Sequence, residues 1–316
     1  MNLKRSAAMF GVLAAGAMAL TACGSDDNSA SGTTVDTSAS NAACEGKDTL
    51  SAAGSSAQKN AMDAFTSTYI AVCKDKGKTV NVAYNLDGVD NLTLNGEVIA
   101  KIFNGGIKKW NDPAIAALNP GATLPDQDVT AIIRSDSSGT TDNFQQYLTA
   151  ASNGAWTTGA GSDFTGGIGE GAKGSAGVAQ AVASAPGSIT YVEKSYADQN
   201  KLSAAQIDTG SGPVALSDES AAKAIEGAQF KGEGVGDLTL DLGSIFGTKE
   251  AGAYPLVLAT YEIVCSKGYD ADTSAAVKSF LTSAANEGQG NLAEQGYVPL
   301  PDSMKEKLNA SVAAIG

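Results

Sequence analysis

The segment around Arg134 combines residue types that suit the binding of an oxyanion. Arg134 follows the apolar run 129–133 and precedes Ser135-Asp136-Ser137-Ser138-Gly139-Thr140. A guanidinium can hold two oxygens at once, and Asp136 stands close enough in the chain to orient it. Helix capping alone would explain Ser138 or Thr140, but it gives an arginine at this position no role. The segment therefore predicts an anion site.

A second junction of the same kind lies nearer the N-terminus. A strand predicted at residues 48–54, with Leu50 as its large apolar side chain, leads into Gly54-Ser55-Ser56-Ala57, and a helical stripe follows. Helix N-termini offer several free amides and a favourable dipole to an anion. Ser56 and the amide of Ala57 are therefore candidate ligands, while capping by Ser56 remains an equal alternative.

Both junctions need strands and helices in alternation to position them. Compact or alternating apolar runs predict strands at residues 79–84, 129–133, 189–192 and 256–264. Apolar stripes with helical spacing predict helices over residues 62–72, from about 144 to 148, and over 179–183. This alternation predicts an α/β architecture. The Gly-rich residues 158–177 are expected to form a surface connection or a loop that closes over a ligand.

The N-terminus has the features of an exported lipoprotein. Lys4 and Arg5 precede an apolar run that is too short to span a bilayer, and small residues then lead to Cys23. We expect residues 1–22 to be a signal peptide, Cys23 to carry lipid, and residues 23–45 to be a flexible linker. The protein should then be anchored on the extracytoplasmic face of the cell membrane.

The remaining cysteines suggest one disulfide. A strand over residues 48–54 and a helix ending near Cys73 have similar lengths and return the chain toward its start, so Cys44 and Cys73 can meet. Cys265 is then left over, and an odd thiol in an exported chain needs a reason.

Composition argues against several other classes of protein. The chain has no histidine, which removes His-based triads and His-ligated metal sites, and no cofactor or metal site is expected. Its formal charge of −13 disfavours nucleic acid. Ser56 and Lys59 fit a Ser-x-x-Lys hydrolase, but the companion motifs of such enzymes are absent. We therefore expect a protein that is not an enzyme.

Many segments, in order, resemble one family. They are Gly54-Ser55-Ser56-Ala57, Gly106-Ile107-Lys108-Lys109-Trp110-Asn111-Asp112, Asn119-Pro120-Gly121, the Arg134 segment, Lys173-Gly174-Ser175-Ala176-Gly177, Pro186-Gly187-Ser188-Ile189-Thr190-Tyr191-Val192-Glu193 and Gly296-Tyr297-Val298-Pro299. The chain resembles the phosphate-binding subunits of phosphate ABC importers, which are type II periplasmic binding proteins. The resemblance implies two α/β domains joined by a hinge, inorganic phosphate as ligand, membrane permease subunits as partners, and a monomer.

The resemblance also implies roles for single residues. It makes Arg134, Ser138, Gly139 and Thr140 phosphate ligands, with Asp136 steadying the arginine. In the first junction it gives Ser56 and Ala57 the same role, although the family usually has an aromatic residue where Ala57 stands.

One departure from the family is large. Residues 80–85 run directly into a segment that resembles sequence beyond the family's hinge strand, so a βαβ unit, with its serine and its proton-accepting aspartate, is missing near Asn85 and Leu86. This division predicts a shortened first domain, residues 46–85 plus 256–316, and a second domain, residues 86–255. Alternatives to phosphate import are a shortened lipoprotein with weak or no phosphate binding and a binder of another tetrahedral oxyanion such as sulfate.

Overall fold

The computed structural model describes residues 50, 61, 80–232, 236, 238–290, 292–293 and 296–316. All of them belong to one compact unit, Ser38–Gly316. The predictions for the signal peptide, the linker, the helix over residues 62–72 and the Cys44–Cys73 disulfide lie outside the described residues, as do those for Cys23, Ser56 and Ala57.

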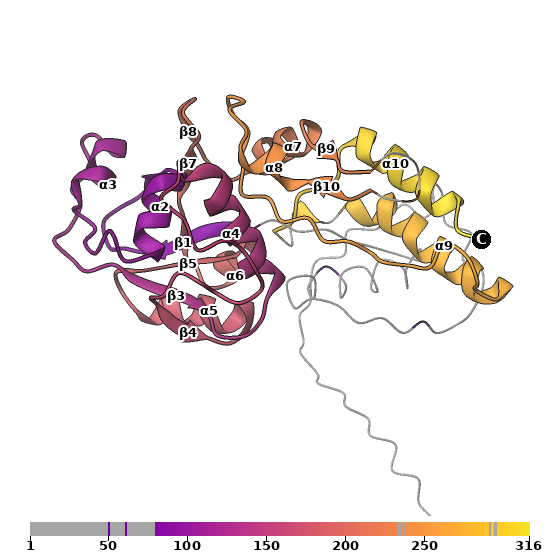
Figure 1. The fold of residues 1–316 in the computed structure, drawn as a ribbon, viewed down its shortest axis with the longest axis horizontal. Helices are drawn as coiled ribbons and strands as arrows, with labels where there is room; N and C mark the ends of the chain where they lie inside the picture. Colours follow the sequence, from indigo (N-terminus) through magenta and orange to yellow (C-terminus); the bar gives the residue numbers. More distant parts are fainter. Residues whose placement is uncertain are drawn as a thin grey trace, which may run out of the picture. The chain divides into compact units, whose positions relative to one another are not determined.

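The central element is a five-stranded sheet with the order β4-β3-β5-β1-β6. Figure 1 shows β4, β3, β5 and β1 one after another in this order. Its strands are β1 (Val80–Asn85), β3 (Thr130–Arg134), β4 (Glu170–Ala172), β5 (Ser188–Glu193) and β6 (Ser203–Ala204). β3 pairs in parallel with both β4 and β5, while β1 is antiparallel to β5 and to β6. The strands predicted at residues 129–133 and 189–192 are thereby confirmed.

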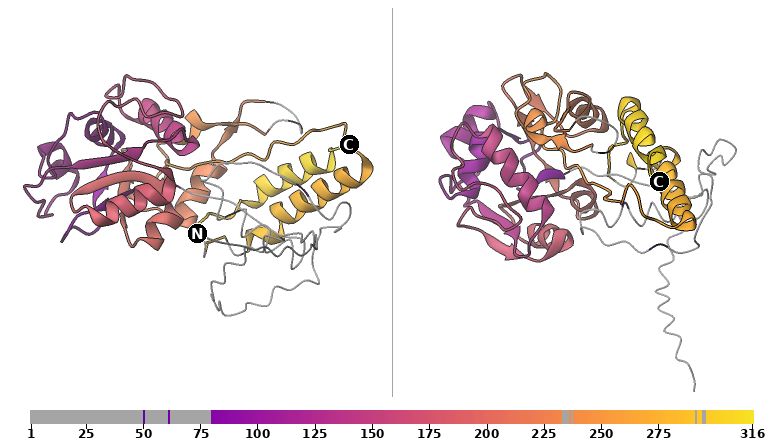
Figure 2. Two further views of the ribbon diagram at one scale, coloured as in Figure 1. Left: turned by 90° about the horizontal axis from the view of Figure 1, so that it is seen from below. Right: turned by 45° about the vertical axis from the view of Figure 1, so that its right-hand side comes forward.

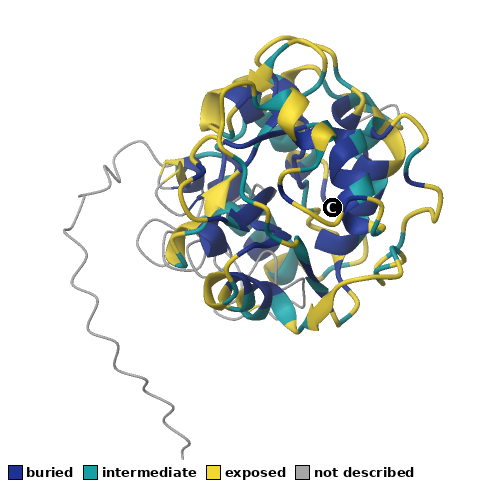
Figure 3. Ribbon diagram, turned by 90° about the vertical axis from the view of Figure 1, so that its left-hand side faces the viewer, coloured by how far each residue is buried: buried dark blue, intermediate teal, exposed yellow. Residues whose placement is uncertain are grey.

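Helices cover both faces of this sheet. The first face packs against α2 (Gly96–Phe103) and α4 (Gly139–Ala151) through a core that includes Phe103, Phe144 and Tyr191. The second face packs against α5 (Gly174–Ser184) and α6 (Lys194–Gln199) through Val178 and Val192, among others. The helices predicted near residues 144–148 and 179–183 are confirmed as α4 and α5. Figure 3 shows the buried residues on the strands and on the inward sides of the helices.

The place of β1 differs from the predicted division of domains. The boundary after residue 85 assigns this strand to the first domain, whereas the structure pairs it with β5 in the same sheet as β3. The physical reason is that both of its faces are apolar: Val82 and Tyr84 join one core cluster and Ala83 joins the other. Such a strand needs a covered, interior position. The rest of the division stays a prediction.

Smaller elements flank the main sheet. They are the three-stranded sheet of β2 (Thr93–Leu94), β7 (Gln206–Asp208) and β8 (Pro213–Val214), the pair β9 (Gln229–Phe230) and β10 (Leu240–Asp241), and the helices α3 (Pro113–Leu118), α7 (Asp218–Glu226) and α8 (Leu242–Phe246). α8 packs on α4, where Phe246 meets the ring of Tyr147 edge-on. These elements extend the core around α4.

The strand predicted over residues 256–264 is wrong. The structure has no regular secondary structure there, although Leu256, Val257 and Leu258 are buried. An extended run becomes a strand only beside a neighbour that completes its hydrogen bonds, and no described segment forms a ladder with it. Ile263 is 93% exposed as a result, and Val264 and the free thiol of Cys265 are exposed beside it.

The C-terminal part of the chain is a helical pair. α9 (Ala271–Ala285) and α10 (Asp302–Ala313) lie side by side, and the short 3-10 helix η3 (Glu287–Gln289) follows α9 (Figure 2). Two hydrogen bonds of 2.9 and 3.0 Å between the side-chain amides of Asn286 and Asn309 link the two helices. Among the described helices, none combines the length and the apolar character that crossing a bilayer requires.

Candidate oxyanion site

The candidate site lies at the carboxyl ends of three parallel strands. β4, β3 and β5 are adjacent and run in the same direction, and α5, α4 and α6 each begin within a few residues of the strand before them. In open α/β sheets the loops at this edge bring helix N-termini together, which is where such folds bind ligands. The sheet therefore brings the side chains of Ser175 and Glu193, which lie 41 and 59 residues further along the chain, close to that of Arg134.

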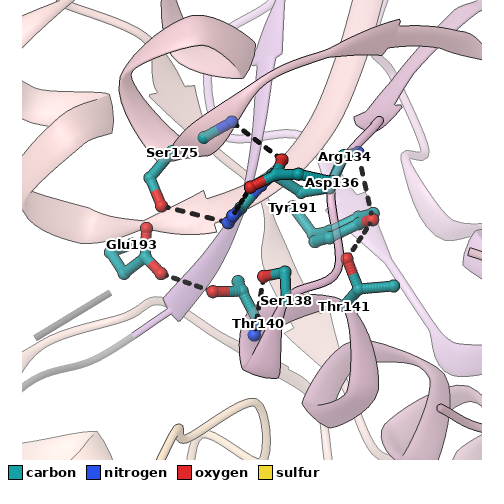
Figure 4. Close-up of polar contacts among 9 residues, drawn as sticks. Arg134, Asp136, Ser138, Thr140, Thr141, Ser175, Tyr191 and Glu193 are labelled. Carbon is teal, nitrogen blue, oxygen red and sulfur yellow. Dashed lines mark hydrogen bonds and ion pairs between the residues drawn. The ribbon is translucent and has the colours of Figure 1, made fainter. Parts of the chain in front are cut away.

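Arg134 is the last residue of β3, and its side chain is fixed by Asp136. Arg134 Nε donates to Asp136 Oδ1 at 2.8 Å and Nη2 donates to Oδ2 at 2.7 Å, so the pair is bidentate (Figure 4). Arg134 is only 5% exposed. Burial opposes its charge, but the hydrogen bonds and charge of Asp136 and the charge of Glu193 outweigh burial and raise the pKa of Arg134. The guanidinium therefore stays positive in a largely water-free place.

Asp136 links this arginine to the start of α5. Its Oδ1 also accepts a 2.9 Å hydrogen bond from the amide of Gly174, the first residue of α5. The N-cap residue of that helix, Lys173, makes no capping bond with its own side chain. Asp136 therefore accepts from one of the otherwise free amides of the first turn. The hydrogen bond from Arg134 holds the pKa of Asp136 well below its usual range, although partial burial opposes this.

The start of α4 supplies further donors. Ser138 is the N-cap residue, and its Oγ accepts from the amide of Thr140 at 3.1 Å. No acceptor among the described residues receives the amides of Gly139 and Thr141. These two N–H groups and the Ser138 hydroxyl proton remain available at the positive end of a helix of 13 residues. An anion is the natural partner of such a set.

Glu193 and Tyr191 are site residues that the sequence did not single out. Thr140 Oγ1 donates to Glu193 Oε1 at 2.6 Å, and Glu193 is fully buried at the end of β5. The Tyr191 hydroxyl accepts from the backbone amide of Arg134 at 3.3 Å and bonds to Thr141 Oγ1 at 2.8 Å. A charged residue that ends a run of buried strand residues was the available signal for Glu193.

Only part of the Gly-rich segment 158–177 forms the expected surface loop. Residues 158–169 are irregular and mostly exposed, but β4 and the start of α5 occupy the remainder. The buried side chain of Gln145 holds this loop through the carbonyls of Gly161 and Asp163 and through both the amide and the hydroxyl of Thr165. The amide of Ser138 also donates to the carbonyl of Ser162 at 2.8 Å. The loop is thus tied to the first turn of α4.

The structure brings together the predicted residues Arg134, Asp136, Ser138, Gly139 and Thr140 at one edge of the sheet. Within the described part of the chain, no group of three or more carboxylate or thiol side chains has the arrangement of a metal site. The arrangement offers a fixed positive charge, free amides and hydroxyls, and no obvious nucleophile with its base. It suits reversible binding of an oxyanion.

Comparisons with known proteins fit this geometry. The family model described as "PBP superfamily domain" matches residues 78–285. The chain is 43% identical to the phosphate-binding protein PstS3 of Mycobacterium bovis and 42% identical to PstS2 of the same species, and each alignment covers 100% of both chains. The alignment with PstS3 extends over 372 positions, whereas this chain has 316 residues, so part of the relative has no counterpart here.

Solved structures show the same fold. A high-affinity periplasmic phosphate-binding protein, solved with phosphate bound, superposes with a TM-score of 0.52 at 23% identity, over 74% of this chain and 69% of its own. A human phosphate-binding apolipoprotein gives a TM-score of 0.51 at 21% identity, over 74% of this chain and 70% of its own. At these identities the likeness establishes the fold, which confirms the predicted periplasmic-binding-protein class.

Proposed function

The chain belongs to the PBP superfamily and, within it, to the phosphate-binding PstS proteins, and we propose on this ground that it binds inorganic phosphate outside the cytoplasmic membrane. The relatives indicate the ligand, since two proteins that align with this chain over their full length are named for phosphate binding. The described site supplies the positive charge and the hydrogen-bond donors that a tetrahedral oxyanion needs.

The proposal rests mainly on Arg134, which is buried and held in place but keeps unused N–H donors. Its guanidinium is buried and locked by Asp136, yet three described contacts use only three of its five N–H donors. The remaining donors, with the amides of Gly139 and Thr141 and the hydroxyl of Ser138, can surround several oxygens of one anion. Such a preorganised set loses little entropy when the anion binds.

The proposed role is capture and delivery and not catalysis. We infer that bound phosphate passes to the membrane permease subunits of an ABC importer, and that a lipid on Cys23 keeps the protein on the outer face of the membrane. Binding would close two domains about a hinge, with a return crossing near Tyr254. The hinge position expected near residues 85–89 does not fit the pairing of β1 with β5, because the residues on both sides of it then belong to one packed body.

A second candidate is a family member with weak phosphate binding or with a different tetrahedral oxyanion as ligand. It is favoured by the length difference from PstS3 and by the predicted loss of a βαβ unit near Asn85. Each lost charge-assisted hydrogen bond would cost about 1.5 to 3 kcal/mol. Ser56 and Ala57 remain the proposed ligands from the first domain.

The test is calorimetric titration of phosphate into the soluble chain that begins after Cys23, with sulfate as a comparison ligand. We expect Arg134→Ala to abolish phosphate binding, because it removes the buried charge and its free donors. Lys108→Ala is the matched control, since Lys108 is exposed and its carbonyl contacts the opposite end of β3. Retained affinity in Arg134→Ala, or no binding by the wild-type chain, would contradict the proposed function.

A further inference from the structure

The Glu193 carboxylate carries an unused hydrogen-bond acceptor inside the site. Glu193 is 0% exposed, and its Oε1 accepts from Thr140 Oγ1 at 2.6 Å. Its Oε2 is buried and has no partner among the described residues. A buried carboxylate oxygen without a donor is costly, so such an atom calls for an explanation. Figure 4 shows Glu193 beside Ser175 and Thr140, on the side of the site that Arg134 faces.

The hydrogen bond to Glu193 also determines whether the Thr140 hydroxyl can donate to a ligand or only accept from it. A threonine hydroxyl has one proton, and here that proton is donated to Glu193. The Thr140 oxygen therefore faces the site as an acceptor only. Glu193 Oε2 lacks a donor among the described residues, and the neighbouring Thr140 Oγ1 can only accept, so a donor on whatever binds beside them would find an acceptor there.

The charges in the site also favour a ligand that carries a proton. Arg134 contributes one positive charge, whereas Asp136 and Glu193 each contribute a carboxylate, and Glu193 lies close enough to Arg134 to act on its pKa. A fully ionised oxyanion would meet the Glu193 carboxylate as a like charge. An oxyanion that still carries a proton can turn the same contact into a charge-assisted hydrogen bond.

We propose that Glu193 is a specificity-determining residue that accepts the proton of a P–OH group. The site then selects tetrahedral oxyanions that are still protonated near neutral pH and rejects sulfate, which is not. This inference rests on the proposed function and adds to it the protonation state of the ligand.

A structural role for Glu193 makes different predictions. A carboxylate near the N-terminus of α4 stabilises the helix whatever ligand binds. If that were its whole role, replacing Glu193 would lower stability and leave the ratio of affinities for protonated and unprotonated anions unchanged. The ratio, and not the affinity alone, is therefore the informative measurement.

The first experiment uses the wild-type chain with phosphate, sulfate and fluorophosphate, titrated by calorimetry at neutral pH. Fluorophosphate is tetrahedral and doubly charged like hydrogen phosphate, but fluorine replaces the hydroxyl, so it has no proton to donate. We expect it and sulfate to bind at least about tenfold more weakly than phosphate, the loss of one charge-assisted hydrogen bond. Equal affinity for fluorophosphate and phosphate would overturn the inference without any mutation.

The second experiment assigns the proton acceptor. Glu193→Gln keeps the shape of the side chain and removes its charge, and its amide can donate to an unprotonated oxygen. We expect the preference for phosphate over sulfate and fluorophosphate to shrink about ten- to hundredfold. Glu226→Gln removes an exposed carboxylate at the end of α7 and serves as the matched control.

The outcomes separate this inference from the proposed function. Wild-type protein that binds phosphate, together with a Glu193→Gln variant that keeps the wild-type preference, contradicts the inference alone. Wild-type protein that binds no phosphate contradicts both. Thermal unfolding without ligand shows whether the variant is folded, and the fluorophosphate result on the wild-type chain decides the matter if it is not.

Discussion

Arg134 and Asp136 form a two-bond ion pair at the end of β3, at 2.7 and 2.8 Å. Only two residues separate them along the chain, yet Asp136 also binds the amide of Gly174, 38 residues away. The pair therefore fixes the orientation of the Arg134 guanidinium and joins the starts of two helices. Its loss should affect folding and binding differently.

Replacing Asp136 by Asn should destabilise the ligand-free protein more than it weakens phosphate binding. The variant leaves the charge of a buried arginine without its counter-ion, at a cost of about 2 to 3 kcal/mol. A bound anion can take over part of that role, so phosphate should raise the Tm of the variant at least as much as that of the wild type. Thermal unfolding with and without phosphate checks this. A variant as stable as the wild type without ligand would show that the pair contributes little.

The pH dependence of stability should also depend on Asp136. Its pKa is lower in the folded protein than the value of about 3.9 in an unfolded chain, so the charged form favours folding. This contribution is fully present above about pH 5 and is lost as the pH falls below about 4 toward the folded-state pKa. Denaturant unfolding from pH 7 to pH 3 should show the stabilities of wild type and Asp136→Asn converging at low pH. A difference that stays constant would argue against this linkage.

Ser138 has a structural and a binding role that can be separated by measurement. Ser138→Ala removes the cap that receives the Thr140 amide and should cost about 1 kcal/mol of stability. It also removes a hydroxyl donor from the site, so phosphate affinity should fall about tenfold. Ser137→Ala is the control, because Ser137 is exposed and does not cap α4. Equal effects of the two substitutions on affinity would exclude Ser138 as a ligand.

Gln145 should control the order of the Gly-rich loop. Gln145→Ala breaks the bonds to Gly161, Asp163 and Thr165 and leaves their backbone groups without partners, at a cost of about 2 kcal/mol or more. Limited proteolysis should then cut within residues 158–169 faster than in the wild type. Gln146→Ala is a close control, since its amide makes a single bond, to Asp142 on the partly exposed side of α4. Similar cleavage of both variants would mean that Gln145 does not hold the loop.

Local sequence patterns predicted the part of the site that lies within one segment. Arg134, Asp136, Ser138 and Thr140 are close in sequence, and a strand, a turn and a helix start suffice to bring them together. Glu193 and Tyr191 could not be found in this way. They reach the site only because β5 pairs in parallel with β3, a long-range arrangement that no short spacing encodes.

The errors in the predicted fold have a common physical cause. Residues 80–85 and 256–264 both have the composition of strands, but composition does not specify the neighbouring strand. β1 pairs with β5, which places it in the same sheet as β3. Residues 256–264 have no such neighbour and remain irregular. Whether such a segment becomes a strand here depends on which partner strand lies beside it.

The exposed residues near 263 have a consequence for how the protein behaves at high concentration. Ile263 and Val264 present β-branched side chains to water, with the thiol of Cys265 next to them. An apolar, extended surface of this kind can align with the same segment of another molecule, and two thiols aligned in this way can oxidise to a covalent link. The lifetime of the soluble protein should therefore fall with concentration and under oxidising conditions. A lysine at position 263 would oppose the alignment by charge repulsion, so Ile263→Lys should keep the chain dispersed in light-scattering measurements.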